Sequence, residues 1–364
     1  MRVIVIADRS GAPGTSATST SGADLARGWS QTAPHDTVEL VSLSDGSAGF
    51  VDSMSPVSER VDPVVVSGPY GGSVPAQIGW RGQTAYVEAA DVVGRHLDDD
   101  GRSPWSASSA GVAELLVAAR EAGAERIVVG VGTDVVCHDG GLGLLRALGA
   151  GEDLNDLPAV CHHWAGVSIV LATAAMLPLT GFHGASAALV TERGVSAHEA
   201  QEHEARLGEL TEVVDASLRQ TSAPGVDLLT GTPRRRERQP GAGAGGGVGY
   251  ALQILGAATA SGAAFALDEL AVQPRLSGAL VVLTTERYDW RSVADGVVAE
   301  TAKAALEAAS PTVVLAREVM VGRREGMSLG ISGTYAMRSG ESWEALGGRV
   351  ARTWSPPPGR PGTG

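Results

Sequence analysis

Uninterrupted apolar runs alternate along the chain with stretches in which apolar residues recur every three or four positions. The first pattern is typical of buried strands and the second of amphipathic helices. Strands are predicted at Arg2–Ala7, Val38–Leu43, Val61–Ser67, Gln83–Ala90, Arg126–Val131, Ser168–Thr173, Leu280–Thr285 and Thr312–Ala316. Helices are predicted from near Ala23 and at Ala110–Gly123, Gly141–Leu148, Ser196–Arg219 and Ser292–Ala309. This alternation indicates an α/β protein with a largely parallel sheet.

The composition narrows the classes of protein that fit this pattern. Aromatic residues make up only 4% of the 364 residues, so Val, Leu, Ile and Ala must build the core. A net charge of -13 disfavours binding to nucleic acid, because the chain repels phosphate backbones. No apolar run reaches the roughly 18 residues of a membrane span, and the N-terminus lacks a signal-peptide pattern. Two distant cysteines, Cys137 and Cys161, fit a reducing compartment. We therefore expect a cytoplasmic protein.

Three polar loops follow predicted strands, and we expect them to face one cleft. They are Asp8–Thr15, Gly132–Gly141 and Glu286–Trp290. In open α/β sheets, ligands bind outside the carboxyl ends of the strands. The loops are therefore the first places to look for chemistry.

Glycines dominate the segment Pro240–Gly249, which reads PGAGAGGGVG. Backbone N–H groups of glycines can close around a phosphate, and a following helix N-terminus adds positive potential. No Gly-Lys-Ser/Thr follows and no clear strand precedes, so the segment is neither a Walker A loop nor a standard dinucleotide fingerprint. A flexible linker or a glycine-packed helix start explains the same composition.

Asp139 stands beside two glycines in the loop after Arg126–Val131. Its carboxylate suits a cation or a substrate hydroxyl, but Asp-Gly is also a common turn dipeptide. His138 is a candidate acid–base residue. The run Cys161-His162-His163-Trp164 lacks the paired spacing of structural zinc sites.

Two carboxylates, Glu286 and Asp289, follow the strand Leu280–Thr285. Together they fit a magnesium site, and they fit surface charge on a loop equally well. The run Arg234-Arg235-Arg236 can contact phosphates or simply form a solvated loop.

Taken in order, these segments resemble the glycerate kinase type 1 family over roughly residues 2–337. Pro240–Gly249 is close to the family's PGAGAAGG segment, and Pro178–Ser186 resembles its PLLGPRGAS stretch. Gly130–Gly141 is similar to its GIGGSATNDGG loop, and Ser44-Asp45-Gly46 matches the start of its ADGGEGT motif. Leu283–Asp289 resembles its ITGEGRLD strand end, one residue short.

The resemblance implies two α/β domains with a cleft between them, one flavodoxin-like and discontinuous in sequence. We expect the first domain at residues 1–66 and 275–345, the inserted second domain at 67–274, and a disordered tail at 355–364. The family phosphorylates glycerate, so the resemblance implies ATP and Mg2+ as cofactors and D-glycerate or a related hydroxy acid as substrate. An oligomeric state does not follow from it.

Several charged residues of the family pattern are missing. The family's first loop reads DSFKGS, whereas this chain has DRSGAPGT and only one lysine, Lys303. The family has a GK pair after its last carboxylate loop, whereas this chain has Ala294-Asp295-Gly296-Val297. Losing one charge aimed at a transferring phosphoryl group costs roughly 3–7 kcal/mol of transition-state stabilisation, judged by arginine fingers. A catalytically impaired paralogue that binds ligands or regulates is therefore the alternative hypothesis.

Arginine can replace lysine as a phosphate clamp, which makes Arg9 and Arg287 catalytic candidates. The complete set of candidate residues follows from the matched motifs. The catalytic candidates are Asp139, Asp45, Arg9 and Arg287; those for nucleotide binding are Gly132, Thr15, Gly241, Gly243, Gly245, Gly246 and Gly247; those for the metal are Glu286 and Asp289.

Overall fold

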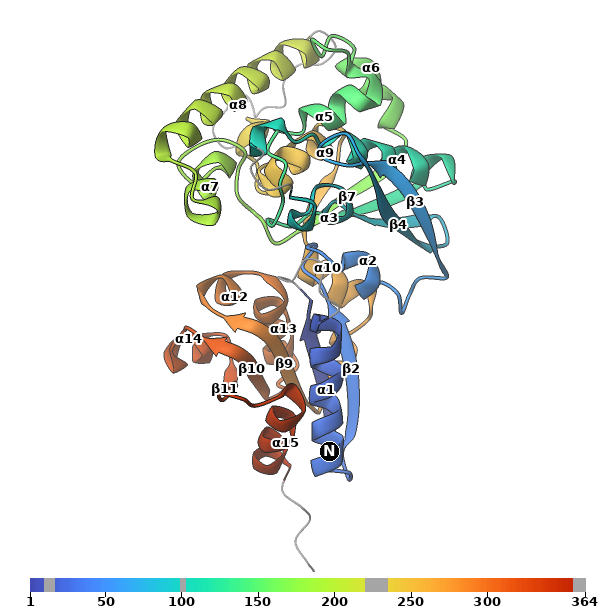
Figure 1. Cartoon of the computed structure of the whole chain (residues 1–364). Coiled ribbons are helices and arrows are strands. Elements are labelled where there is room, and N and C mark those ends of the chain that lie inside the picture. Colours follow the sequence, from blue (N-terminus) through green and yellow to red (C-terminus); the bar gives the residue numbers. More distant parts are fainter. Residues whose placement is uncertain (10–16, 99–102, 220–234, 356–364) are drawn as a thin grey trace, which may run out of the picture. The chain divides into compact units, whose positions relative to one another are not determined.

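The computed structural model describes residues 1–9, 17–98, 103–219 and 235–355. The chain forms two compact units, one of Met1–Asp45 with Ala263–Gly364 and the other of Gly46–Gly262 (Figure 1). The first domain was expected to end at residue 66. It ends earlier because the strand at Arg60–Ser67 pairs inside the second sheet. Apart from Ser355, the predicted tail lies outside the described residues.

The first unit is built on one five-stranded sheet whose adjacent strands are all parallel. The strands lie in the order β11-β10-β9-β1-β2, which is 2-1-3-4-5 when they are numbered within the unit. This is the flavodoxin-like order. The prediction of a flavodoxin-like, discontinuous domain is therefore confirmed. The bounds are β1 Arg2–Asp8, β2 Thr37–Leu43, β9 Ala279–Tyr288, β10 Thr312–Val319 and β11 Ile331–Ala336.

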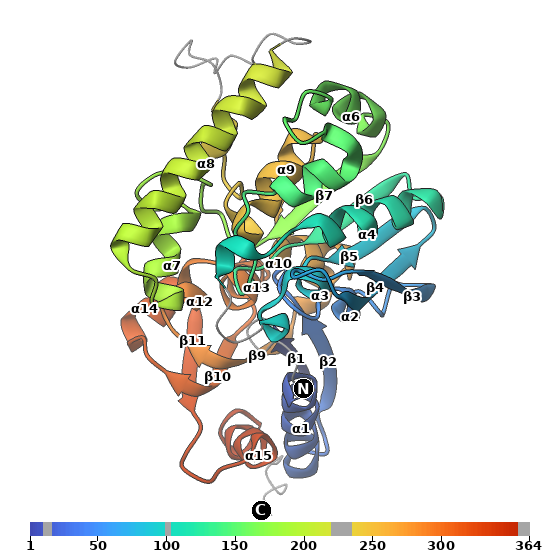
Figure 2. The ribbon, with the colours of Figure 1, turned by 45° about the horizontal axis from the view of Figure 1, so that its top comes forward.

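Helices cover both faces of this sheet, which explains its continuous apolar strands. Helices α1 and α15 lie side by side on one face (Figures 1 and 2), where Trp29 and Leu346 pack on Val3 and Val5. Ile4 and Ile6 alternate with these residues and are equally buried. The helices of the unit are α1 Ala17–Thr32, α10 Gly262–Glu269, α11 Gln273–Leu276, α12 Trp290–Ala294, α13 Gly296–Glu307, α14 Arg323–Ser328 and α15 Trp343–Trp354.

The single helix predicted at Ser292–Ala309 is divided into α12 and α13. Asp295 has extended backbone angles and Gly296 has a φ of +87°, a conformation that costs glycine little. A new helix N-terminus therefore begins at Gly296. The Asp295 side chain precedes this helix without capping it.

The second unit contains a six-stranded mixed sheet in the order β3-β4-β5-β6-β7-β8. The first three strands pair antiparallel, and β5 to β8 pair in parallel. The strands are β3 Arg60–Ser67, β4 Ser73–Arg81, β5 Thr84–Glu88, β6 Arg126–Gly130, β7 Ser168–Thr173 and β8 Ala258–Ser261. Strands β4 and β8 were missed, because β4 mixes polar and apolar residues and β8 has only four residues.

Helices of the second unit pack around one large core that includes Trp80, Leu116, Ile127 and Trp164. The longest, α8, begins with the predicted capping box, in which Ser196 and Glu199 exchange hydrogen bonds. Helix α7 lies beside it (Figure 2). The helices are α2 Phe50–Ser53, α3 Ala90–Val93, α4 Ala110–Glu121, α5 Leu142–Leu145, α6 Leu157–Trp164, α7 Ala185–Arg193, α8 Ala197–Leu218 and α9 Val248–Ile254. Of the described helices, none combines the length and apolar content needed to cross a bilayer.

Candidate functional site

The carboxyl edge of the first sheet has its switch point between β1 and β9. The chain leaves β1 towards β2 on one side, and leaves β9 towards β10 on the other. Asp8 ends β1, and its Oδ2 accepts a hydrogen bond of 3.1 Å from the hydroxyl of Thr285 on β9. Crevices at such switch points are where doubly wound sheets bind ligands. This edge is the best candidate for a site in the first unit.

Two further carboxylates, Asp45 and Asp295, lie close to each other near this edge. Asp45 follows β2, and its Oδ2 lies 3.5 Å from the position that a Cβ on Gly296 would occupy. Burial and the neighbouring charge of Asp45 raise the pKa of Asp295. Like charges are therefore held together at the start of α13.

Three predicted site residues lie at or just after the carboxyl end of β9, and each contacts a neighbouring side chain or backbone group. Glu286 pairs with Arg317 at 2.5 Å, and exposed Arg287 lies 3.6 Å from Glu318. The Asp289 carboxylate accepts hydrogen bonds from the first N–H groups of α12, so it acts as a helix cap. Within the described ranges, no group of three or more His, Cys, Asp or Glu side chains is placed to hold a metal ion. A metal role for Glu286 and Asp289 remains a prediction.

The first loop is only partly described. The backbone N–H of Arg9 donates to the carbonyl of Leu43 at 2.9 Å, which ties the end of β1 to the end of β2. Thr15 lies outside the described residues. The roles predicted for Arg9 and Thr15 remain predictions.

In the second unit, the glycine segment is buried and packed against neighbouring backbone. A Cβ on Gly246 would come within 2.0 Å of the Cys137 carbonyl, and one on Gly247 within 2.3 Å of the Gly140 Cα. The N–H of Gly245 donates to the carbonyl of Gly132 at 3.1 Å. Close backbone packing therefore accounts for these glycines directly.

The other glycine candidates have similar surroundings. The N–H of Gly243 donates to the Leu177 carbonyl at 3.0 Å, and Gly241 is buried beside Thr259. The donors of Gly243 and Gly245 are thus already paired with protein carbonyls. The segment forms a tight turn, with positive φ at Gly245, Gly246 and Gly247, that leads into α9. Its phosphate-binding role remains a prediction.

The Asp139 carboxylate accepts hydrogen bonds from two segments of the second unit. One of its oxygens accepts from the N–H and hydroxyl of Ser109 and from the N–H of Gly143, each at 2.9 Å, and the other accepts from Gly141 N–H at 2.8 Å. The carboxylate joins the start of α4 to the start of α5. It also lines an open hollow of about 380 Å³ together with Ser108 and Arg146. Asp139 is therefore the candidate of this unit that borders open space.

Sequence reasoning missed the buried carboxyl group of Glu88 and the half-buried Asp91 beside it. Glu88 accepts hydrogen bonds from the N–H groups of Gly49 and Val51, at 3.1 and 2.9 Å. Burial, with Asp91 as the next cause, raises the pKa of Glu88 to about 8, and burial also raises the pKa of Asp91. The only sequence signal was a glutamate at the end of the otherwise uncharged strand β5.

A buried imidazole network was also missed. His203 bridges the Ser186 hydroxyl at 2.8 Å and the carbonyl of His138 at 2.7 Å, and Trp105 stacks on its ring at 3.9 Å. Burial, together with the charges of His203 and Arg193, lowers the pKa of His138 to about 3. His138 is therefore neutral near pH 7 and contributes no positive charge there.

The first unit has side chains and a helix N-terminus that suit the Mg2+ ion and the phosphate that the resemblance implies. Carboxylate oxygens are the ligands that Mg2+ prefers, and Asp8 and Asp45 follow or end the adjacent strands β1 and β2 at this sheet edge, although the described residues group no three such side chains around one point. An anion such as a phosphate prefers a helix N-terminus, and that of α13 begins beside Asp45 without a side-chain cap. The donor set of the first unit thus suits a cation-bound phosphate better than a bare anion.

The comparisons with known proteins cover nearly the whole chain. The model of the Glycerate kinase family matches residues 4–345. Uncharacterized proteins of Mycobacterium tuberculosis and Mycobacterium bovis are each 32% identical over 339 residues, covering 91% of this chain and 82% of theirs. Glycerate 2-kinase of Escherichia coli is 29% identical over 316 residues, covering 80% of this chain and 79% of its own.

A solved structure has the same fold. It is of a Salmonella typhimurium protein provisionally described as glycerate kinase 2, with a TM-score of 0.72, 24% identity, and coverage of 97% of this chain and 98% of that one. This likeness supports the two-sheet α/β architecture. Because the family model spans both units and the sheet order agrees with the expected fold, the chain belongs to the glycerate kinase family.

Proposed function

We propose that this protein is an ATP-dependent phosphotransferase that phosphorylates D-glycerate or a related small hydroxy acid. Relatives named glycerate kinase, at 26–29% identity, support this proposal. The structural observation that carries it is the contact between Asp8 and Thr285 at the switch point of the first sheet. A cytoplasmic location is part of the same proposal.

In this proposal, the carboxylates at the sheet edge hold the nucleotide through its metal ion. Asp8 and Asp45 would contribute oxygens to Mg2+, which neutralises charge on the phosphates when it is bound. The hydroxyl of Thr285 orients Asp8, because it donates to that carboxylate. Arg9 follows Asp8 directly, and its bidentate guanidinium would supply the positive charge that the family pattern has in a lysine.

A coupled assay of ADP release with D-glycerate, ATP and Mg2+ tests the proposal. We expect turnover that depends on all three components and that Asp8→Asn reduces by at least about a hundredfold, the scale of removing a group aimed at transition-state charge. Arg2→Gln, a change at the opposite end of β1, serves as the matched control. The proposal is wrong if a panel of small hydroxy acids gives no turnover above that of Asp8→Asn.

The contact between Asp45 and Asp295 favours a second candidate, a paralogue that binds ligand but transfers phosphate poorly. Two neighbouring carboxylates repel phosphate in the segment that stands where the resemblance expects a GK pair. Calorimetry with Mg2+ and ATP separates the candidates. Clear binding without turnover supports the paralogue, and robust turnover supports the kinase.

A further inference from the structure

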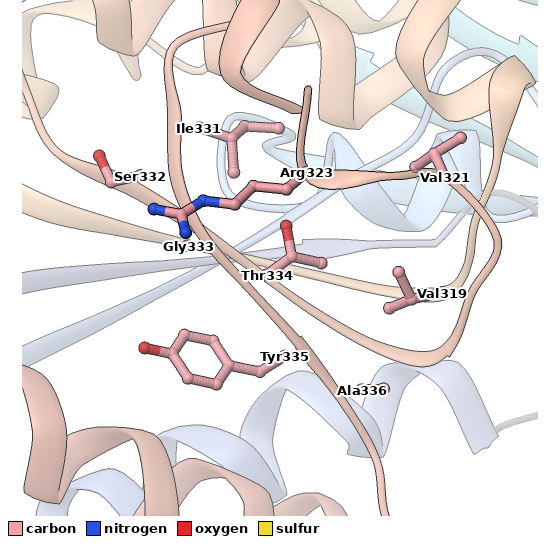
Figure 3. Close-up of a pocket in the computed structure, with 9 residues that line it drawn as sticks. All are labelled: Val319, Val321, Arg323, Ile331, Ser332, Gly333, Thr334, Tyr335 and Ala336. Atoms are coloured by element: carbon pink, nitrogen blue, oxygen red, sulfur yellow. The ribbon is translucent and has the colours of Figure 1, made fainter. Parts of the chain in front are cut away.

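The exposed edge of the first sheet carries a groove that lies apart from the switch point. The groove runs along β11 and has a volume of about 430 Å³ (Figure 3). It is lined by Val319, Val321, Arg323, Ile331, Ser332, Gly333, Thr334, Tyr335 and Ala336. Among the described strands, β11 is the last of its sheet, and none of them pairs with the other side of its backbone. Unpaired strand edges are templates for the addition of another strand.

Along Ile331–Tyr335 this edge lacks the charge and proline that usually protect against strand addition, whereas at its end Arg349 Nη2 donates to the Ala336 carbonyl at 2.9 Å. Edge strands are commonly blunted by charge, proline or shortness. At the opposite edge of the same sheet, β2 carries Glu39 in an ion pair with Arg275. At one edge of the second sheet, β3 carries Asp62 and Pro63. The strand at Ile331–Ala336 reads ISGTYA and has neither charge nor proline. After a shift of register at its start, it pairs regularly with β10 through Ala336.

The groove has one cation and no acid in its lining. In the part of the chain that the structure describes, Arg323 forms no hydrogen bond or ion pair. Its side chain extends towards Ser332 and Gly333 (Figure 3). Apolar groups of Val319, Val321 and Ile331 line the same groove. On a chain of net charge -13, this is a groove of mixed polar and apolar lining with an available guanidinium.

We propose that β11 binds an extended peptide segment of another protein, which adds as a further strand and places an acidic side chain against Arg323. Main-chain hydrogen bonds along Ile331–Tyr335 would supply affinity, and the Arg323 guanidinium would supply specificity. A second copy of this chain fits less well. Two-fold pairing of β11 with itself would bring two Arg323 guanidiniums and an uncharged strand together, without a carboxylate.

Binding of short capped peptides to the full-length protein tests the proposal by fluorescence anisotropy. The peptides carry β-branched residues at alternate positions and a single Glu, with matched Gln peptides. We expect saturable binding of Glu peptides that Arg323→Glu weakens by at least about tenfold, the scale of one charge-assisted hydrogen bond. Arg324→Glu, an exposed neighbour outside the groove, should leave binding unchanged.

Two further measurements test whether the peptide binds as a strand and whether the variants are folded. Methylating alternate backbone nitrogens of the peptide should abolish binding, because strand addition needs those N–H groups. Circular dichroism confirms that both variants fold. The proposal is overturned if no Glu peptide binds at millimolar concentration, if Gln peptides bind equally well, or if Arg323→Glu has no effect. It is also overturned if sedimentation shows a dimer of this chain that excludes the peptide, since a second copy would then be the occupant.

Discussion

The Thr285 hydroxyl lies 3.1 Å from the Asp8 carboxylate and 3.2 Å from the carbonyl of Arg287. A hydroxyl has one proton, so it can donate to only one of these acceptors at a time. Donation to Asp8 links the ends of β1 and β9 at the switch point. Thr285 therefore orients the carboxylate on which the proposed function depends.

Replacing Thr285 with valine should weaken this site while preserving the fold. The substitution keeps the shape and removes the donor, so we expect kcat/KM for ATP to fall by about tenfold, the scale of one hydrogen bond to a charged group. The free energy of unfolding should change by no more than about 1.5 kcal/mol. If turnover is too slow to measure, the affinity for Mg2+ and ATP gives the same comparison.

Thr312→Val is the matched control for this experiment. Thr312 begins β10 at the amino end of the same sheet, and its hydroxyl makes one local hydrogen bond to Ser310. A loss of activity as large as that of Thr285→Val would show that the effect comes from sheet stability rather than from Asp8.

Gly246→Ala should severely destabilise the second unit. A Cβ there would lie 2.0 Å from the Cys137 carbonyl, and the φ of +63° is strained for alanine. Overpacking and backbone strain together should cost about 3 kcal/mol or more. Gly149→Ala has a φ of +96° and open space, so it should cost only about 1–2 kcal/mol. Urea unfolding measures both, and equal costs would contradict the packing role.

Glu88→Gln should flatten the dependence of stability on pH. The folded state raises the pKa of Glu88 from 4.5 to about 8, so it binds this proton more tightly than the unfolded chain does. The contribution of Glu88 to stability is therefore greatest below its unfolded pKa and is lost as the pH rises towards about 8. Asp91, whose pKa is also raised, acts in the same direction.

Urea unfolding across this pH window isolates the effect as the difference between wild type and Glu88→Gln. We expect the free-energy advantage of the wild type to shrink as the pH rises. A difference that stays constant or grows would contradict a protonated Glu88 in the folded state.

Gly296→Lys should restore a cation at the start of α13. A Cβ there would lie at an ordinary 3.5 Å from Asp45 Oδ2, so the side chain has room beside that carboxylate. We expect tighter binding of ATP with Mg2+ by at least about tenfold, because the new ammonium offsets the Asp45–Asp295 repulsion. The positive φ should cost about 1–2 kcal/mol of stability.

Gly340→Lys provides the control for backbone strain, since Gly340 has a φ of +74° in open space in the same unit. It should lose similar stability and leave nucleotide affinity unchanged. Calorimetry compares the two variants, and equal affinities would show that the missing lysine does not limit binding.

Local pattern alone predicted most of the described strands and the longest helix, α8. The apolar runs of β1, β6 and β7 were recognised within a residue or two, and so was the capping box of Ser196 and Glu199. These features depend on side chains within a turn of each other. The order of the glycine and aspartate motifs was enough to indicate the family, although Leu283–Asp289 is one residue shorter than the family's motif.

Only the tertiary structure determined which residues these motifs contact. Gly246 packs on Cys137 and Asp45 lies near Asp295, although these residues are far apart in the chain. The pKa of Glu88 is raised because folding buries its carboxyl group and places Asp91 beside it. Apolar periodicity and helix capping are set by neighbours in sequence, whereas burial, like-charge contacts and free sheet edges arise only when distant segments pack.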